Sequence, residues 1–153
     1  MAGNVARSET PVRAARDDAP TTATLTALVD TDRIHALHRI ARGEEKFLDT
    51  YVNAAFEELE QAIVDLRKAT NAMDVRAARD ALHIIEGTGA SIGAVALVAN
   101  CKSMRGYLSV PDDPDRAGAL AELSTTYMLT KSTVLASLHE PRGRVSRSGA
   151  TRG

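Results

Sequence analysis

Apolar residues recur every three to four positions along five successive segments of this chain. That spacing places them on one face of an α-helix, whereas no segment keeps the period-two alternation of a β-strand. The longest segment covers residues 44 to about 69. Its predicted apolar stripe consists of Phe47, Tyr51, Ala55, Leu59, Ala62 or Ile63, and Leu66. The pattern predicts an all-α fold.

The other four segments are shorter, and capping residues mark several of their ends. A first helix is expected after Thr31 or Asp32 and before Gly43. Two more are expected over residues 74–91 and from about residue 94 onward. The last is expected to begin at Asp113, with Pro114 at its first helical position. The predicted core residues on these segments are Ile34, Leu37, Ile40 or Ala41, Val75, Ala78, Leu82, Ile85, Leu97, Cys101, Met104, Leu108, Leu120, Leu123, Tyr127, Val134 and Leu138.

Short connections at residues 71–73 and 109–113 force consecutive helices to lie antiparallel. The prediction is therefore an antiparallel four-helix bundle with a short additional N-terminal capping helix, over residues 25–139. Residues 1–24 contain almost no large apolar side chains and are predicted to be a disordered linker. Residues 140–153 contain four arginines, and they are predicted to be a disordered basic tail.

Bulk composition narrows the classes of partner and location. A net charge of −1 gives no electrostatic reason to expect nucleic-acid binding, and no apolar run approaches the roughly 18 residues of a membrane span. Cys101 is the single cysteine, so an intrachain disulfide and a thiolate zinc site are excluded. We expect a cytoplasmic protein without a metal, monomeric as an isolated domain. His35 and His38 are three residues apart, but no nearby acid or thiol completes a metal site.

His83 is the candidate for chemistry. At about 100° per residue, it shares a helix face with Arg76, Arg79, Glu86, Gly87 and Ala90, while the core stripe of the same helix points elsewhere. His83 is therefore predicted to be exposed, on a surface that carries charged and small residues. Exposed histidines have no function by default, and His35, His38 and His139 are interpreted in that way.

Glycines follow His83 inside the same predicted helix. Each interior glycine gives up roughly 1 kcal/mol of helix stability relative to alanine, so a steric reason is expected. Gly87 stands one turn beyond His83, and the missing side chain leaves the imidazole accessible to another protein. For Gly89 and Gly93, close approach between helices of this chain is an equally good explanation.

The run HIIEGTGASIGA at residues 83–94 resembles the signature of histidine-phosphotransfer (Hpt) domains. The following helix, with Leu97, Cys101 and Met104, and the preceding segment 43–66 are also similar to that family, so the resemblance spans roughly residues 30–138. It implies that His83 accepts a phosphoryl group from a receiver aspartate and passes it to a response-regulator aspartate. Neutral imidazole is a competent nucleophile near pH 7.

The resemblance also implies a carrier rather than an enzyme, with receiver domains as partners. A receiver would supply the Mg²⁺, so no cofactor is expected here, and no GxxxxGK[ST] loop for ATP is present. Hpt domains often form the C-terminal domain of hybrid sensor histidine kinases, and the layout of this chain is similar to theirs. By the same resemblance, a quorum-sensing hybrid kinase of the diffusible-signal-factor type is one parent protein that we expect.

One position departs from the family. Glu86 stands where lysine is usual, and like charges about 6 Å apart repel by roughly 0.7 kcal/mol in water and about 3 kcal/mol at an effective dielectric of about 20. Arg79, Lys102 or Arg105 could offset this repulsion. We hypothesise that Glu86 and Arg105 form a charge-swapped pair that retunes partner choice. The expected docking surface consists of Arg76, Arg79, Glu86, Gly87, Thr88, Ala90, Lys102 and Arg105.

Two alternatives to a phosphoryl carrier stay open at this point. Glu86 is compatible with a docking module of the same fold that binds a receiver without efficient transfer. The other alternative is an unrelated helical bundle in which His83 has no role.

Overall fold

The computed structural model describes residues 28–139, and within them the chain forms five helices. They are α2 (Thr31–Ala41), α3 (Glu45–Asn71), α4 (Val75–Ser91), α5 (Val95–Leu108) and α6 (Arg116–His139). The described part contains no strand, as predicted. The predicted linker at 1–24 and the predicted tail at 140–153 lie outside the described residues.

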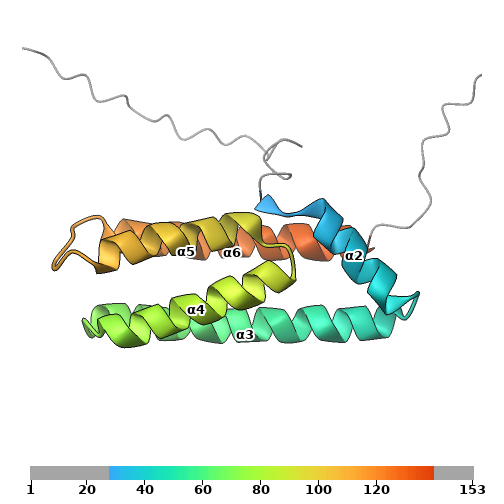
Figure 1. The fold of residues 1–153 in the computed structure, drawn as a ribbon, viewed down its shortest axis with the longest axis horizontal. Coiled ribbons are helices and arrows are strands. Elements are labelled where there is room, and N and C mark those ends of the chain that lie inside the picture. The colour runs from blue at the N-terminus through green and yellow to red at the C-terminus, as the bar shows by residue number, and fades with distance from the viewer. Residues whose placement is uncertain (1–27, 140–153) are drawn as a thin grey trace, which may run out of the picture.

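Four long helices run up and down in sequence order, and α2 covers one end (Figure 1). Helix α3 packs against α4, α4 against α5 and α5 against α6, while α2 contacts α3 and α6. This arrangement is the predicted antiparallel four-helix bundle with an N-terminal capping helix. None of these helices is both long and apolar enough to cross a membrane.

The helix ends show how the local sequence starts and stops each element. The Asp30 and Asp74 carboxylates accept hydrogen bonds from the backbone N–H groups of Arg33 at 3.1 Å and Ala77 at 3.0 Å, which caps α2 and α4. The prediction of Thr31 or Asp32 as the cap of α2 was therefore wrong by one or two residues. After α2 the chain turns through left-handed conformations at Arg42 and at Gly43, as the predicted stop requires.

Helix α6 begins later than predicted. Its first helical residue is Arg116, and the Asp113 side chain accepts a hydrogen bond from the N–H of Asp115 at 2.9 Å. Asp113 and Pro114 therefore belong to a turn, which follows a left-handed residue at Asp112. Asp113 thus acts as the predicted capping acid, but it caps the turn that leads into α6, and the helix itself begins at Arg116.

The core consists of apolar side chains from every helix, and most predicted core residues are buried. The exceptions are concentrated on α3, where Phe47 is 54% exposed and Tyr51 is 39% exposed. Leu48 and Val52 point inward in their place, so the stripe at the start of α3 was predicted one residue out of register. Val75 and Leu138 are only partly buried, and of the alternatives Ile40 and Ala41 it is Ala41 that is buried.

Helices α3 and α6 are also joined by a polar contact at Glu60. The Glu60 carboxylate accepts hydrogen bonds from the Tyr127 hydroxyl at 2.7 Å and from the Lys131 ammonium at 2.6 Å. The Lys131 and Tyr127 hydrogen bonds lower the pKa of Glu60, because they favour its charged form. Burial, followed by the hydrogen bond to Glu60, raises the pKa of Tyr127. The ring of Tyr127 meets Phe56 edge to face, with centroids 6.2 Å apart.

Thr130 gives a stability prediction, because its hydroxyl is buried without a hydrogen-bond partner among the described residues. Thr130→Val removes that unsatisfied group and is expected to raise the free energy of unfolding by about 1 kcal/mol. Urea denaturation measures the change. Thr70→Val is the matched control, because the buried Thr70 hydroxyl donates to the Leu66 carbonyl at 2.7 Å and its loss gives no gain. Equal responses of the two variants would contradict this explanation.

Candidate functional site around His83

His83 lies in the middle of α4 and is exposed, as predicted. Its exposure follows from its neighbours on α4. Leu82 and Ile85 are fully buried, so they fix which face of the helix meets the core, and His83 lies on the other face. The imidazole consequently projects into solvent from a rigid helix. An incoming group can reach it without any rearrangement of the bundle.

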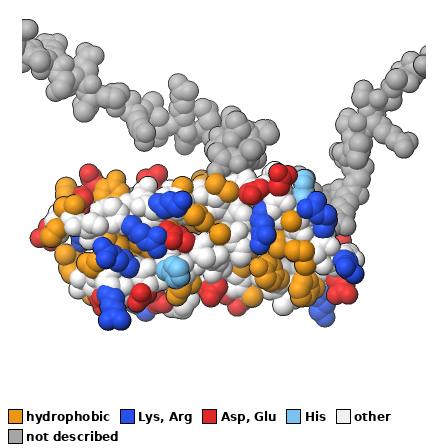
Figure 2. Space-filling model, viewed as in Figure 1, with side chains coloured by type: hydrophobic (Ala, Val, Ile, Leu, Met, Phe, Trp, Pro, Cys, Tyr) orange, Lys and Arg blue, Asp and Glu red, His pale blue; other side chains and the backbone are white. Residues whose placement is uncertain are grey.

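The residues predicted to share this face of α4 are also at the surface. Arg76, Arg79, Gly87 and Ala90 are exposed, while Glu86 is partly buried. Lys and Arg side chains gather over α4 and α5 on the face shown in Figure 2, and a histidine side chain lies among them. Sequence reasoning missed Asp80, which is exposed one turn before His83 and adds a negative charge to the same face.

The glycines after His83 separate into two kinds. A Cβ added at Gly87 would meet nothing within 4 Å, so no contact among the described residues 28–139 requires a glycine there. A Cβ at Gly89 would touch Val98 of α5 at 3.4 Å, and Gly93 has a φ of +76° with the Asp30 carbonyl oxygen 3.0 Å from its Cβ position. The left-handed φ and the close Asp30 oxygen explain Gly93, whereas a Cβ at Gly89 would make only ordinary van der Waals contacts, and the bare surface at Gly87 faces outward.

A shallow groove of about 530 Å³ opens beside this bare position, between α3 and α4. Its lining residues are Tyr51, Ala54, Ala55, Glu58, Gly87, Thr88 and Ser91. The Thr88 hydroxyl donates to the Glu58 carboxylate at 2.6 Å and so ties the two walls together. The predicted residue Thr88 is therefore engaged within the chain, and its partner Glu58 was missed by sequence reasoning.

Exposed apolar side chains also lie on α3 and α4, the two helices that form this groove. Phe47 and Tyr51 project from α3, and Ile84, next to His83 on α4, is 43% exposed. The two aromatic residues are the ones that the sequence had assigned to the core. Aromatic side chains at a surface are typical of protein interfaces, because they bury a large area at a small cost in conformational entropy.

Glu86 and Arg105 form the predicted contact. One guanidinium nitrogen of Arg105, Nη1, lies 2.6 Å and 2.7 Å from the two carboxylate oxygens of Glu86. The side chains are 18% exposed for Glu86 and 38% exposed for Arg105. The pair thus brings a cation from α5 to within one helical turn of His83. Its effect on partner choice stays a hypothesis.

Cys101 lies one turn before Arg105 on α5 but does not compete with His83 as a nucleophile. Burial raises the pKa of the Cys101 thiol to about 12, with a further rise from Glu86 and an opposing effect of Arg105. The reactive thiolate is therefore scarce at neutral pH.

The remaining predicted docking residues lie elsewhere on α4 and α5. Ala90 and Lys102 line a second groove of about 350 Å³, together with Asp30 and Val95. Within residues 28–139, Lys102 forms no ion pair, and neither do Arg76 and Arg79. Lys102 therefore does not share the Glu86 contact with Arg105.

The other histidines give no second candidate. His35 and His139 are exposed and His38 is half-buried, at the opposite ends of the described chain. No three His, Cys, Asp or Glu side chains come together as potential metal ligands in residues 28–139.

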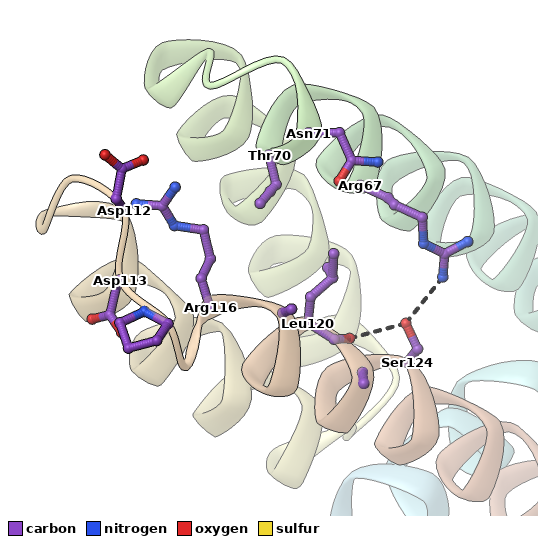
Figure 3. A pocket seen from close by; sticks show the side chains of 11 residues that line it. Arg67, Thr70, Asn71, Asp112, Asp113, Arg116, Leu120 and Ser124 are labelled. Carbon is purple, nitrogen blue, oxygen red and sulfur yellow. Dashed lines mark hydrogen bonds between the residues drawn. The ribbon is translucent and has the colours of Figure 1, made fainter.

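A larger hollow of about 720 Å³ lies away from His83, between α3, the α5–α6 loop and α6 (Figure 3). Arg116 is buried there and donates to the backbone carbonyls of Tyr107 at 3.3 Å and Val110 at 2.6 Å. These bonds satisfy the Tyr107 carbonyl in the last turn of α5, which has no partner in the helix, and the Val110 carbonyl in the loop that follows. Arg67 donates to Ser124 at 3.3 Å at the far side of the hollow. The hydrogen bonds of Arg116 and Arg67 around this hollow therefore stabilise the packing of α3, the α5–α6 loop and α6.

Comparison with known proteins decides what this helical bundle is. The sequence profile of the Hpt domain matches residues 50–132, which include α4 and His83. The chain belongs to the Hpt family. This Hpt domain is accordingly a histidine-phosphotransfer domain of two-component signalling, a class of carriers whose partners are receiver domains.

A solved structure supports the same assignment of fold. Histidine-containing phosphotransfer protein B (HptB) from Pseudomonas aeruginosa PAO1 superimposes on this Hpt domain with a TM-score of 0.63 at 17% sequence identity. The match covers 74% of this chain and 96% of that one, so the two share nearly the whole bundle. No curated protein sequence matches the chain.

Proposed function

We propose that His83 is the phosphorylation site of this Hpt domain and relays a phosphoryl group between two receiver aspartates. The observation that carries the proposal is the exposed imidazole beside Gly87, where an added Cβ would meet nothing within 4 Å among residues 28–139. A helix gives up stability for such a glycine, and the gain is access to the imidazole for another protein.

The chemistry needs few groups from this chain. An unprotonated imidazole nitrogen of His83 forms a bond to phosphorus, the bond from phosphorus to the aspartyl oxygen of the donor breaks, and the aspartate leaves as a carboxylate. The reverse step, onto a second aspartate, regenerates neutral imidazole. A receiver supplies the Mg²⁺ that offsets the charge of the transferring group, so positioning is the contribution of the Hpt domain.

A receiver would dock over α4 and the neighbouring wall of α3. Exposed Phe47, Tyr51 and Ile84 offer apolar area close to the groove at Gly87, while Arg76 and Arg79 offer positive charge. Ala90 and Lys102 extend this surface toward α5. We assign the docking surface to these residues together with Glu86, Thr88 and Arg105.

The wider context follows from the same proposal. A monomeric, cytoplasmic carrier that needs no cofactor of its own suits a module of a hybrid sensor histidine kinase, and a quorum-sensing kinase is one such parent.

The second candidate function is a docking module without efficient transfer, which the negative charge of Glu86 favours. Its ion pair with Arg105 weighs against that alternative, because the charge beside His83 is compensated.

A phosphotransfer profile tests the proposal. Each receiver domain of the source organism is phosphorylated with acetyl phosphate and Mg²⁺ and mixed with the Hpt domain, and label on the Hpt domain is followed over time. We expect acid-labile label from one or a few receivers within minutes, because complementary surfaces select among similar partners. Tight binding of a receiver without any label would instead support the docking module.

A further inference from the structure

The Glu86–Arg105 ion pair lies beside His83 and holds a positive charge next to the Glu86 carboxylate. Glu86 follows His83 by three residues, so their Cβ atoms are about 5–6 Å apart on the helix surface. Arg105 reaches this carboxylate from another helix, and its position is fixed because Cys101 and Met104 on the same helix are fully buried. The cation is therefore held where the carboxylate lies.

The balance of charge around His83 depends on this pair. Arg79 and Asp80, one turn before His83, carry opposite charges, as do Glu86 and Arg105. A phosphoryl group brings a further charge of about −1.5 to −2 at neutral pH. Without Arg105, the carboxylate of Glu86 would repel that group across a single helical turn.

We propose that Arg105 is a positioning residue that cancels the charge of Glu86 and so permits phosphorylation of the neighbouring His83. This inference rests on the proposed function of His83. Arg105 acts here through Glu86, without a contact to the phosphoryl group. Because only Nη1 makes the two contacts, charge matters more than the forked shape of the guanidinium, and lysine is expected to serve.

The test is a cycle of four proteins: wild type, Arg105→Gln, Glu86→Gln and the double variant. The readout is the equilibrium ratio of phosphorylated Hpt domain to phosphorylated receiver. Arg105→Gln is expected to lower that ratio by about threefold to about a hundredfold, the range for like charges about 6 Å apart between bulk water and an effective dielectric of about 20. Glu86→Gln is expected to raise the ratio, because it leaves the charge of Arg105 uncompensated, and the double variant is expected to return the ratio to the wild-type level.

Two further variants separate charge compensation from a structural role. Arg105→Lys is expected to keep the wild-type ratio. Lys131→Gln breaks the other ion pair of the described residues, with Glu60 between α6 and α3, and is expected to leave the ratio unchanged. Thermal unfolding of every variant shows whether the bundle is intact.

Distinct results overturn the inference. It is wrong if Arg105→Gln matches the wild type, or if the double variant stays as low as Arg105→Gln, since Arg105 would then act directly on the phosphoryl group or on the receiver. If Arg105→Gln does not fold, Glu86→Gln decides, because a lowered ratio in that variant contradicts charge compensation. Absence of label on the wild type with every receiver would overturn the proposed function instead.

Discussion

Replacing His83 with glutamine is expected to abolish phosphorylation of the Hpt domain by any phosphorylated receiver. Glutamine keeps a polar side chain on the exposed face of α4 but has no nucleophilic nitrogen, so no covalent intermediate can form. The loss is expected to be complete within detection, while the free energy of unfolding changes by less than about 0.5 kcal/mol, because the site is at the surface. Gel separation of the phosphorylated and unmodified forms measures the transfer.

His35→Gln provides the matched control for this substitution. His35 is exposed on α2, outside the helix that carries His83, and its replacement is expected to leave the transfer unchanged. Residual acid-labile label on His83→Gln would mean that another residue accepts the phosphoryl group. An equal loss of transfer in both variants would mean that each substitution impairs transfer by disturbing the fold and not by removing a nucleophile.

Placing a leucine at Gly87 is expected to stabilise the bundle and yet slow phosphotransfer by about a hundredfold. The stabilisation, about 0.8 kcal/mol, follows from the helix propensity of leucine and from the open space at this position. The slower transfer follows because the new side chain projects one turn from His83, and a displacement of about 1 Å between reacting groups costs a factor of that order. Urea denaturation and transfer kinetics measure the two effects separately.

Gly118→Leu is the control for the glycine substitution. Gly118 lies in the first turn of α6, where an added Cβ also meets nothing within 4 Å. Here leucine is expected to stabilise the bundle without any effect on transfer. If Gly87→Leu transferred at the wild-type rate, the bare surface next to His83 would have no role in docking.

Much of the fold could be predicted because the helical period persists through each segment. Along α4 and α5 the buried apolar positions recur every three to four residues, so Leu82, Ile85, Leu97 and Met104 were placed correctly, although the apolar Ile84 and Val95 are exposed. The same period fixed the direction of His83, since a residue next to a fully buried Leu82 lies about 100° around the helix. Exposure of His83 was thus a consequence of the core pattern.

The start of α3 was mispredicted because two apolar sets compete there. Phe47 and Tyr51 begin one set, but its next members lead to Glu58, a charged residue. Leu48 and Val52 begin the other, which continues through apolar residues along the whole helix and is the buried one. Continuity over six turns, rather than the size of the first side chains, decides which face enters the core.

Other features differ in whether a local sequence pattern indicates them. The hydrogen bond from Thr88 to Glu58 joins residues 30 positions apart, and no local pattern indicates it. The late start of α6 depends on a turn at Asp112 and Asp113 whose left-handed backbone is not encoded by a glycine. The Glu86–Arg105 contact could be predicted because opposite charges stood at one departure from the family pattern.

The most direct test of the account is to locate the phosphoryl group on the protein. The Hpt domain is incubated with a phosphorylated receiver and Mg²⁺, digested at neutral pH, and its peptides are sequenced by mass spectrometry. We predict a single modified residue, His83, and loss of the modification in acid. A phosphoryl group on any other residue, or receiver dephosphorylation that leaves the Hpt domain unmodified at every residue, would contradict the account.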